Sequence, residues 1–344
     1  MNMNIMIMMI KTVTLILYIF TVPLLMLAKQ GGSNSITSSF NFPSFGGNTA
    51  RARIELEHDA TLSPHTHTLE LTTNLPNADP SWSYGRASYG SPVRLWDPLS
   101  GTLVDFETRF AFSMRQLSNE TADSSADGMT FFLAPFDSKI ANDSSGAQLG
   151  LLPRGLGTFS SPDYKFVAVE FDTHQNDFDP SPQHVGIDIN TVVSKKSMSW
   201  TYSSMSDGRE ANAWVRYDST SRNLSVFLTY DQNPVFSWDY YLLSYVVDLR
   251  DYLPARVRVG FTGATGLRSQ THSVYSWSFN STLNLIDERI IILEVPSPSP
   301  EVSPSPSPPG PSVETVNTSS QGKGMKYSLA TGLALGFGFV IFCL

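Results

Sequence analysis

Between residues 34 and 293 bulky apolar side chains recur at every second position, which is the period of a β-strand with one buried face. The stretch 106–114 carries its bulky residues on even positions, and similar stretches cover 185–190, 224–230, 256–261 and 274–279. Clusters of Gly, Pro, Asn and Asp separate them, and no helical apolar period of useful length occurs. The pattern predicts an all-β domain built as a sandwich of two antiparallel sheets.

The first residues follow a different pattern. Residues 1–28 hold one charge, Lys11, followed by an apolar run, which is typical of a secretory signal peptide cleaved near Ala28 or the pair Gly31 and Gly32. A retained signal anchor is the alternative, although the run is short for a membrane span. Entry into the secretory pathway agrees with five Asn-x-Ser/Thr sequons, at which we expect N-glycosylation: Asn119, Asn142, Asn223, Asn280 and Asn317.

The last residues also lie outside the predicted sandwich. Segment 294–326 is rich in Pro and Ser, a composition that favours an extended polyproline stalk. Small residues, a polar spacer and the apolar tail 327–344 follow the order of a GPI-anchor signal, and a terminal membrane helix is the alternative. Both readings predict a domain, residues 34–293, held at the extracellular face of the plasma membrane.

Composition narrows the classes further. Of 344 residues, 41% are hydrophobic, which is enough for a large core, and the net charge of −8 argues against nucleic-acid binding. The single cysteine, Cys343, excludes an intramolecular disulfide and a cysteine-ligated zinc site.

The predicted strand Val167–Asp172 carries unusual chemistry. Its apolar residues face one side, so Glu170 and Asp172 share the other side, where two carboxylates repel each other and lose hydration. A divalent cation would offset that cost, and the following loop offers further ligands in Asn176, Asp179 and His184. Oxygen ligands suit calcium, and carboxylates with one imidazole suit manganese or another transition ion.

Two other readings of this strand remain open. One is a solvated acidic loop beside an ordinary strand. The other is a retaining glycosidase, in which such a pair supplies the nucleophile and a helper. That reaction needs a facing acid, but the next residue on this side of the strand is His174.

The middle of the chain resembles the legume-type (L-type) lectins, a family of carbohydrate-binding proteins with a concanavalin-like jelly-roll sandwich of antiparallel sheets. The resemblance covers nearly the whole region and is carried by residues 39–45, 85–89, 92–97, 126–135, 169–173, 184–188, 260–266 and 276–279. The domain also looks like the ectodomain of lectin receptor kinases, although kinase motifs are missing from the chain.

The resemblance implies two metal ions and no catalysis. Mn²⁺ would be held by Glu170, Asp172, Asp179 and His184, with Ser194 reaching it through water. Ca²⁺ would be held by Asp172, Asn176, Asp179 and the backbone carbonyl of His174. Both ions would brace the sugar loops rather than act as Lewis acids.

The resemblance also implies a shallow sugar site. Asp127, after a cis Ala126–Asp127 peptide bond, and Asn176 would bind adjacent hydroxyls, while Leu267 and Arg268 take the variable contact positions. Two residues depart from the family pattern: His174 replaces a stacking aromatic, and Ala147 replaces a glycine that offers its N–H to the sugar.

The resulting hypothesis is a cell-surface lectin for cell-wall or microbial glycans, able to form a homodimer and to signal through a partner receptor. The alternative is a degenerate lectin fold that binds a protein partner, as an interaction module or co-receptor, without binding sugar.

Overall fold

The computed structural model describes residues 34–75, 77–117, 126–200, 205–231, 234 and 241–285. The chain divides into two units, Met1–Glu294 and Val295–Leu344, and every described residue belongs to the first. The leader 1–28, the stalk, the apolar tail and the sequons at Asn119 and Asn317 all lie outside the described residues. Within the described part of the chain, no helix has the length and hydropathy needed to cross a membrane.

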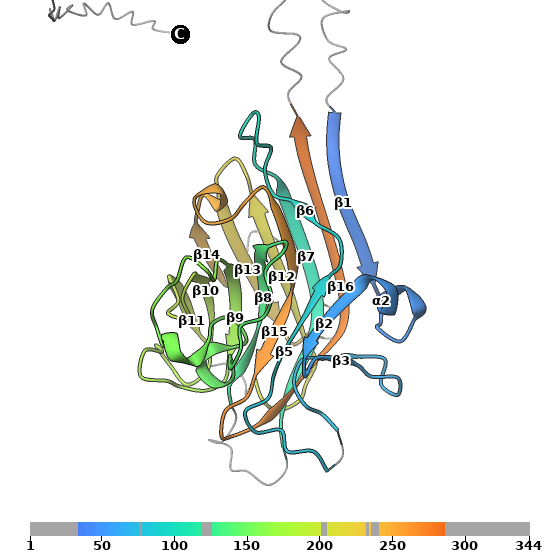
Figure 1. Ribbon diagram of the computed structural model, residues 1–344, viewed down its shortest axis with the longest axis vertical. Helices are drawn as coiled ribbons and strands as arrows, with labels where there is room; N and C mark the ends of the chain where they lie inside the picture. Colours follow the sequence, from blue (N-terminus) through green and yellow to red (C-terminus); the bar gives the residue numbers. More distant parts are fainter. Residues whose placement is uncertain are drawn as a thin grey trace, which may run out of the picture. The chain divides into compact units, whose positions relative to one another are not determined.

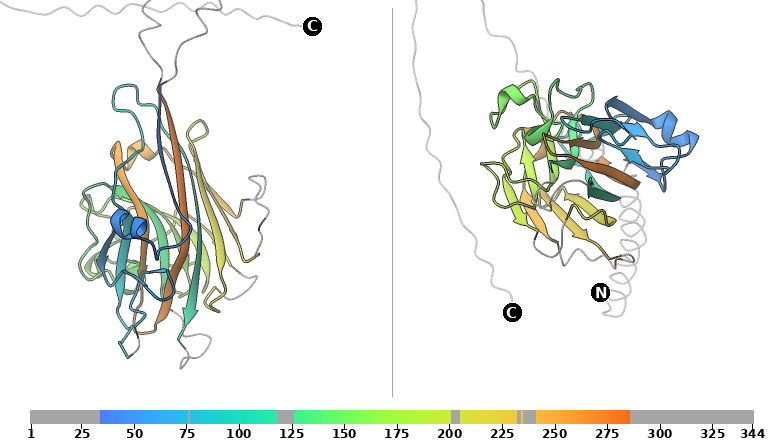
Figure 2. Two further views of the ribbon diagram at one scale, coloured as in Figure 1. Left: turned by 90° about the vertical axis from the view of Figure 1, so that its right-hand side faces the viewer. Right: turned by 90° about the horizontal axis from the view of Figure 1, so that it is seen from below.

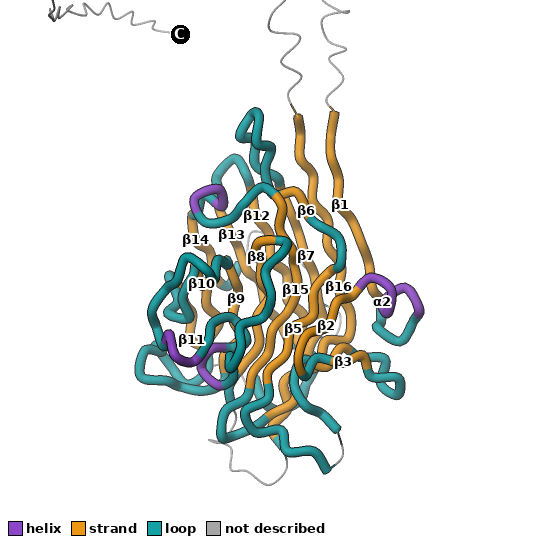
Figure 3. Tube along the Cα trace, in the orientation of Figure 1, coloured by secondary structure: helices purple, strands orange, loops and turns teal. Residues whose placement is uncertain are grey.

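Two eight-stranded sheets form the domain (Figures 1 and 3). The first sheet has the order β14-β13-β12-β7-β16-β4-β3, and β1 pairs with β16. Its strands are β1 (Asn34–Phe42), β3 (Thr61–Leu62), β4 (Leu69–Glu70), β7 (Asp105–Gln116), β12 (Ala211–Asp218), β13 (Asn223–Thr229), β14 (Leu243–Val246) and β16 (Gln270–Leu285).

The second sheet has the order β11-β10-β9-β8-β15-β5-β2, and β6 pairs with β15. Its strands are β2 (Ile54–His58), β5 (Tyr84–Tyr89), β6 (Val93–Arg94), β8 (Gly128–Pro135), β9 (Val167–Asp172), β10 (His184–Ile189), β11 (Lys196–Ser199) and β15 (Arg256–Ala264). All recorded pairings in both sheets are antiparallel, which confirms the predicted fold class.

Helical structure among the described residues is short. It comprises α2 (Asn48–Arg53) and the 3₁₀ turns η2 (Gly146–Gln148), η3 (Arg154–Leu156) and η4 (Leu249–Asp251). The hydrophobic pattern did not predict α2, because its six residues bury only Ala50 and so leave no helical apolar period to detect.

Figure 2 shows the two layers of strands from the side and from below. Aromatic side chains fill the space between these layers. Phe110 on β7 meets Phe261 on β15 edge to face, with ring centroids 4.9 Å apart. Phe112 and Phe171 make a tilted ring contact with centroids 4.8 Å apart. These rings come from opposite sheets, so they fix how the layers pack.

A second, smaller core lies on the other face of the second sheet. It contains Phe132 and Ala134 of β8, Ala168 of β9 and Leu152 and Phe166 from the long segment between β8 and β9. Neighbours of these residues along β8 and β9 belong to the main core. Strands β8 and β9 are therefore buried on both faces, and polar side chains on the second face need specific partners.

Strand β16 departs from strict alternation. Val274, Trp277 and Phe279 all belong to the main core, although a period of two would place residues 274 and 277 on opposite faces. The register with β7 shifts between Val274 and Ser276, so Tyr275 is an extra residue in a β-bulge. The bulge returns the apolar residues on both sides of it to the same face.

Candidate functional site

Three neighbouring strands of the second sheet bring their polar ends to one edge. Asp172 ends β9 and lies opposite His184, the first residue of β10. It also lies opposite Gly128, the first residue of β8, so Asp127 enters the same edge. The Ala126–Asp127 peptide bond is cis. Antiparallel order thus gathers residues that are far apart in the sequence.

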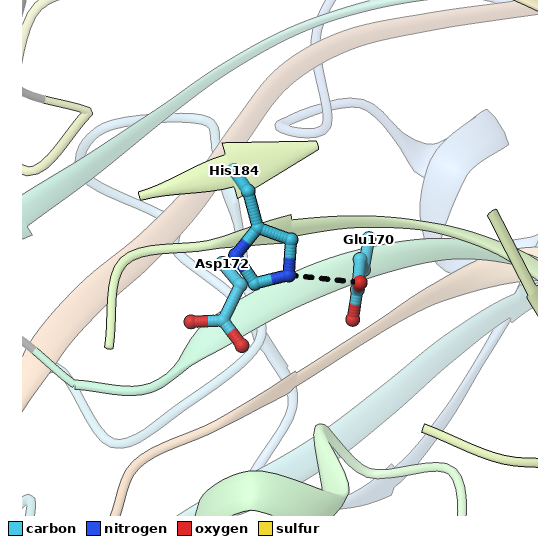
Figure 4. A group of neighbouring side chains, drawn as sticks. All are labelled: Glu170, Asp172 and His184. Atoms are coloured by element: carbon cyan, nitrogen blue, oxygen red, sulfur yellow. Dashed lines mark hydrogen bonds and ion pairs between the residues drawn. The ribbon is translucent and has the colours of Figure 1, made fainter. Parts of the chain in front are cut away.

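An acidic cluster is buried at this edge (Figure 4). Glu170, Asp172 and His184 each present one ligand atom, and these atoms lie within 4.8 Å of one another. His184 Nε2 lies 3.1 Å from Glu170 Oε1. The carboxylate residues are 1% and 2% exposed, respectively, and His184 is fully buried. The structure therefore places Glu170 and Asp172 on the same face of β9, as the alternation predicted.

The sequence analysis missed one member of the cluster, Asp188 on β10. Ser194 Oγ lies within hydrogen-bond distance of both Glu170 and Asp188 Oδ1, the latter at 2.8 Å, and its single proton can be donated to either carboxylate. Gly186, opposite Glu170, leaves room for this arrangement, since a Cβ there would collide with Glu170 and Ser194. The signal was available, because Asp188 lies four residues after His184 on an alternating strand and therefore shares its face.

The loop after β9 adds Asn176 and Asp179. The Asn176 N–H donates to Asp179 Oδ2 at 2.7 Å, and the Asp179 N–H donates to the Asn176 carbonyl at 3.0 Å. The His174 N–H donates to Asp172 Oδ1 at 2.6 Å. Asp179 Oδ1 lies 3.9 Å from His184 Nε2. All six predicted metal ligands therefore lie in this loop or on the two strands that it joins.

The electrostatics of the site favour a bound cation. Burial, reinforced by the negative charge of Asp179, raises the pKa of Asp127 to about 7. Burial also raises the pKa of Asp179 to about 6, and burial together with Glu170 raises that of Asp172 well above its ordinary value. A cation among these carboxylates would remove that cost.

Unpartnered oxygens agree with this reading. Asn176 Oδ1, Asp127 Oδ2 and Asp188 Oδ2 are buried without a hydrogen-bond partner in the described structure. Buried polar atoms of this kind are rare unless an ion, water or ligand completes them. The oxygen-rich donor set with one imidazole fits calcium together with manganese.

A shallow hollow of about 460 Å³ opens beside the cluster, and we call it the rim hollow. All six residues predicted to contact sugar line it: Asp127, Ala147, His174, Asn176, Leu267 and Arg268. Leu267 is 74% exposed, whereas Asp127 is 3% exposed. The rim hollow therefore has a buried polar floor and an open, variable wall.

The rim hollow also has lining residues that were not predicted to contact sugar, among them Trp82, Gln148 and Arg154. Trp82 is 46% exposed, and the guanidinium of Arg154 stacks 4.5 Å from its ring centroid. The backbone N–H of Trp82 donates to the Gly266 carbonyl, which fixes the loop of Trp82 against the loop that carries Leu267 and Arg268. Sequence pattern gave no signal for Trp82, because its loop joins the site only through tertiary packing.

A buried hydrogen-bond chain supports Asp127 from below. Thr173 Oγ1 donates to the Asp127 carbonyl at 2.8 Å and accepts from Gln270 Nε2 at 2.8 Å. Gln270 Nε2 lies 3.0 Å from His272 Nε2, and His272 Nδ1 lies 2.9 Å from Thr72 Oγ1. Since an amide nitrogen only donates, His272 Nε2 accepts and the imidazole is neutral.

We expect His272 to make the fold acid-sensitive. Burial lowers its pKa to about 3, so below pH 6.5 the unfolded chain binds a proton that the folded chain does not. Stability should fall by about 1.4 kcal/mol per pH unit between pH 6.5 and pH 3 from this group. His272→Gln should flatten that slope in urea titrations with chelator present, whereas His65→Gln, at an exposed histidine, should not. Equal slopes in all three proteins would contradict this role.

Comparison with known proteins supplies the family. The profile of the legume lectin domain matches residues 37–291. The chain belongs to the legume lectin family.

Individual legume lectins match along most of their own length. The bark lectin of Styphnolobium japonicum is 42% identical over 253 residues, which cover 72% of this chain and 87% of that protein. The solved basic winged bean lectin with Tn-antigen is 38% identical, with a TM-score of 0.61, and covers 72% of this chain and 99% of its own. The winged bean acidic lectin with methyl-α-D-galactose is 36% identical, with a TM-score of 0.62. The match covers 73% of this chain and 100% of that chain.

Legume lectins are non-enzymatic carbohydrate-binding proteins. In this legume lectin the acids also lack access to a polysaccharide, because Glu170 and Asp172 are almost wholly buried. The sequence argument against a glycosidase was the lack of a facing acid, whereas the structure places an additional acid, Asp188, beside Glu170, with Ser194 between them. Burial of the whole cluster, rather than a missing acid, therefore speaks against hydrolysis.

Three sequons of this legume lectin fall on described residues. Asn142 and Asn280 are exposed, and Asn223 is half-buried with its amide donating to Ser225 Oγ at 3.0 Å. Asn280 lies on β16, and its neighbour Phe279 belongs to the core, so its side chain lies on the outer face of the first sheet. Glycosylation at these positions stays a prediction.

Proposed function

We propose that this legume lectin binds glycans in the rim hollow. The observation that carries the proposal is the carboxylate of Asp127, which is buried, lines the rim hollow and leaves Oδ2 without a partner. Asn176 lines the same hollow beside it. A carboxylate acceptor next to an amide donor matches two adjacent sugar hydroxyls, each of which can donate and accept.

The other residues that line the rim hollow would supply the remaining contacts with the sugar. The Ala147 N–H supplies a backbone donor, the His174 ring packs on an apolar sugar face, and Leu267 and Arg268 select among sugars. A shallow, open hollow with few anchors supports weak binding of a monosaccharide and stronger binding of a multivalent surface.

We propose that two ions hold the loops in place. Mn²⁺ would be held by Glu170, Asp172, Asp179 and His184, with Ser194 reaching it through water, and Ca²⁺ by Asp172, Asn176, Asp179 and the His174 carbonyl. The ions supply charge compensation and fixed geometry, and this chain's residues bind the sugar. Raised pKa values of Asp127, Asp172 and Asp179 support the need for such compensation.

Metal analysis of the purified protein, paired with a glycan array with and without chelator, tests both proposals. Galactose-type ligands are the first probes, because solved relatives are complexed with methyl-α-D-galactose and with GalNAc. Near-stoichiometric calcium and manganese with a chelator-sensitive signal would support the proposal. Metals with a silent array would instead favour the protein-partner reading, and a metal-free protein would overturn the site assignment.

Trp82 is expected to form a second stacking surface. Its exposed ring lines the rim hollow, where His174 offers only a small aromatic ring. Trp82→Ala should weaken glycan affinity by about 2- to 10-fold, the usual value of an aromatic contact. Titration calorimetry against the best array ligand would measure it, with Phe159→Ala, at an exposed aromatic outside the rim hollow, as control. Unchanged affinity in Trp82→Ala would exclude this contact.

We also propose that the domain acts at the extracellular face of the plasma membrane, by a GPI anchor or a terminal membrane helix, with signalling left to a partner receptor. The leader pattern, the sequons and the terminal apolar tail support this location. Release of the protein from intact cells by phosphatidylinositol-specific phospholipase C would support the GPI anchor. Retention on the cells would favour the helix, and absence from the cell surface would contradict both.

A further inference from the structure

A second hollow, of about 290 Å³, lies on the outer face of the second sheet, and we call it the arginine hollow. Its floor is formed by Arg86 of β5, Phe132 of β8 and Thr262 of β15, and residues 138–142 and 163–166 wall it. It shares no lining residue with the rim hollow. Nothing in the glycan proposal uses this space.

Arg86 gives the arginine hollow its chemistry. The residue is 5% exposed, and its guanidinium stacks 4.4 Å from the ring centroid of Phe132. Nη2 donates to Ser138 Oγ at 3.0 Å, and Nε lies 3.4 Å from Glu57 Oε1 without making a hydrogen bond. Nη1 has no partner among the residues that the structure describes.

The neighbouring Arg258 makes more hydrogen bonds than Arg86 does, three against one. Its Nε donates to the Phe136 carbonyl at 2.6 Å, and Nη1 donates to Glu55 at 2.7 Å and Ser88 at 2.9 Å. Arg86 makes only one of the five hydrogen bonds that its donors allow. Nε faces Glu57, with which Arg86 forms an ion pair, so an anion in the hollow would accept from the Nη groups of this buried cation.

The rest of the lining is amphiphilic. Lys139 and Lys165, both exposed, stand at the opening against one carboxylate, that of Asp163. Ile140, Leu151 and Phe166 supply apolar walls that are almost fully buried. The volume is at the lower end for small-molecule sites. These features suit a small ligand with one anionic end and an apolar body.

We propose that the arginine hollow binds a small organic carboxylate. The carboxylate accepts hydrogen bonds from Arg86, and the apolar body packs on Phe166 and Leu151. The lysines at the opening attract the anion. Binding is independent of the sugar, so this site stands even if the rim hollow has another role.

The test uses the purified mature protein and titration calorimetry with phenylacetate, hexanoate and the uncharged isostere phenylacetamide. Wild-type protein should bind at least one acid saturably and at least 10-fold more tightly than the amide, since charge-assisted hydrogen bonds are worth about that factor or more. The double variant Lys139→Glu/Lys165→Glu should lower the affinity for the acid several-fold. Lys196→Glu, at an exposed lysine on β11, should not.

Arg86→Gln should remove the preference for the acid over the amide, and its melting temperature reports whether it folds. If it does not fold, the lysine variants decide, because their side chains are exposed. Each titration is repeated in the Asn142→Gln background, because a glycan on Asn142, which lines the arginine hollow, would cover the opening of that hollow. Equal affinity for acid and amide, or no saturable acid binding in either background, would overturn the proposal.

Discussion

Asp127→Asn should abolish detectable glycan binding while the fold and the metal content remain. The substitution keeps the size of the side chain but removes the charge that accepts sugar hydroxyls. Loss of a charge-assisted hydrogen bond costs about 1.5–3 kcal/mol, or about 10- to 100-fold in affinity. A shallow sugar site would then fall below the detection limit of a glycan array. Calorimetry with wild type and variant at equal metal loading would measure the loss.

The same substitution has a second expected effect. Burial raises the pKa of Asp127 to about 7, so between about pH 4 and 7 the folded metal-free protein holds a proton that the unfolded chain has released. The carboxyl of the unfolded chain ionises near pH 4. The free energy of unfolding therefore falls as the pH rises from about 4 to 7, and this group adds no further loss above about pH 7. Metal-free Asp127→Asn should therefore be more stable than wild type at pH 8 and lose this part of the pH slope.

Asp137→Asn provides the matched control, since this aspartate is exposed and lines neither hollow. It should bind glycan as wild type does. Glycan binding retained by a folded, metal-loaded Asp127→Asn would place the sugar site elsewhere on the domain.

Removal of the metals should lower the melting temperature substantially. Ligands present at about 1,000 times their dissociation constant add about 4 kcal/mol of stability, which corresponds to roughly 8–16 °C for a domain of this size. Asp172→Ala should reproduce the loss without chelator, because this carboxylate sits between Glu170 and the loop that carries Asp179. It also loses the hydrogen bond from the His174 N–H.

Differential scanning calorimetry and elemental analysis of the same samples would measure both effects. Chelator should add little to Asp172→Ala, because both treatments remove the same ions. Asp177→Ala, at an exposed aspartate of the same loop, should keep its metals and its melting temperature. A wild-type melting temperature that chelator leaves unchanged would refute the idea that ions brace this loop.

Much of the fold was predictable because a half-buried strand leaves a two-residue pattern in the sequence. The stretches at 106–114, 185–190 and 256–261 correspond to β7, β10 and β15. The pattern was less informative in β16, where the bulge at Tyr275 shifts the period by one residue. It also missed α2, which is too short to show a helical period.

The candidate site divides in a similar way. The pairing of Glu170 with Asp172 depends only on neighbours along one strand, so alternation predicts it. The roles given to Asp127, Ala147, Leu267 and Arg268 came from family resemblance, because their loops are far apart in the sequence. The structure brings these loops to one hollow.

The sequence by itself determined the all-β class, the acidic face of β9 and the residues able to hold cations, because each follows from local periodicity or residue chemistry. Tertiary structure alone decided that Trp82 borders the rim hollow and that Arg86 is buried with its Nε lacking a hydrogen-bond partner. The physical reason is that strand order and loop packing arise from long-range burial of two sheet faces, which no local pattern encodes.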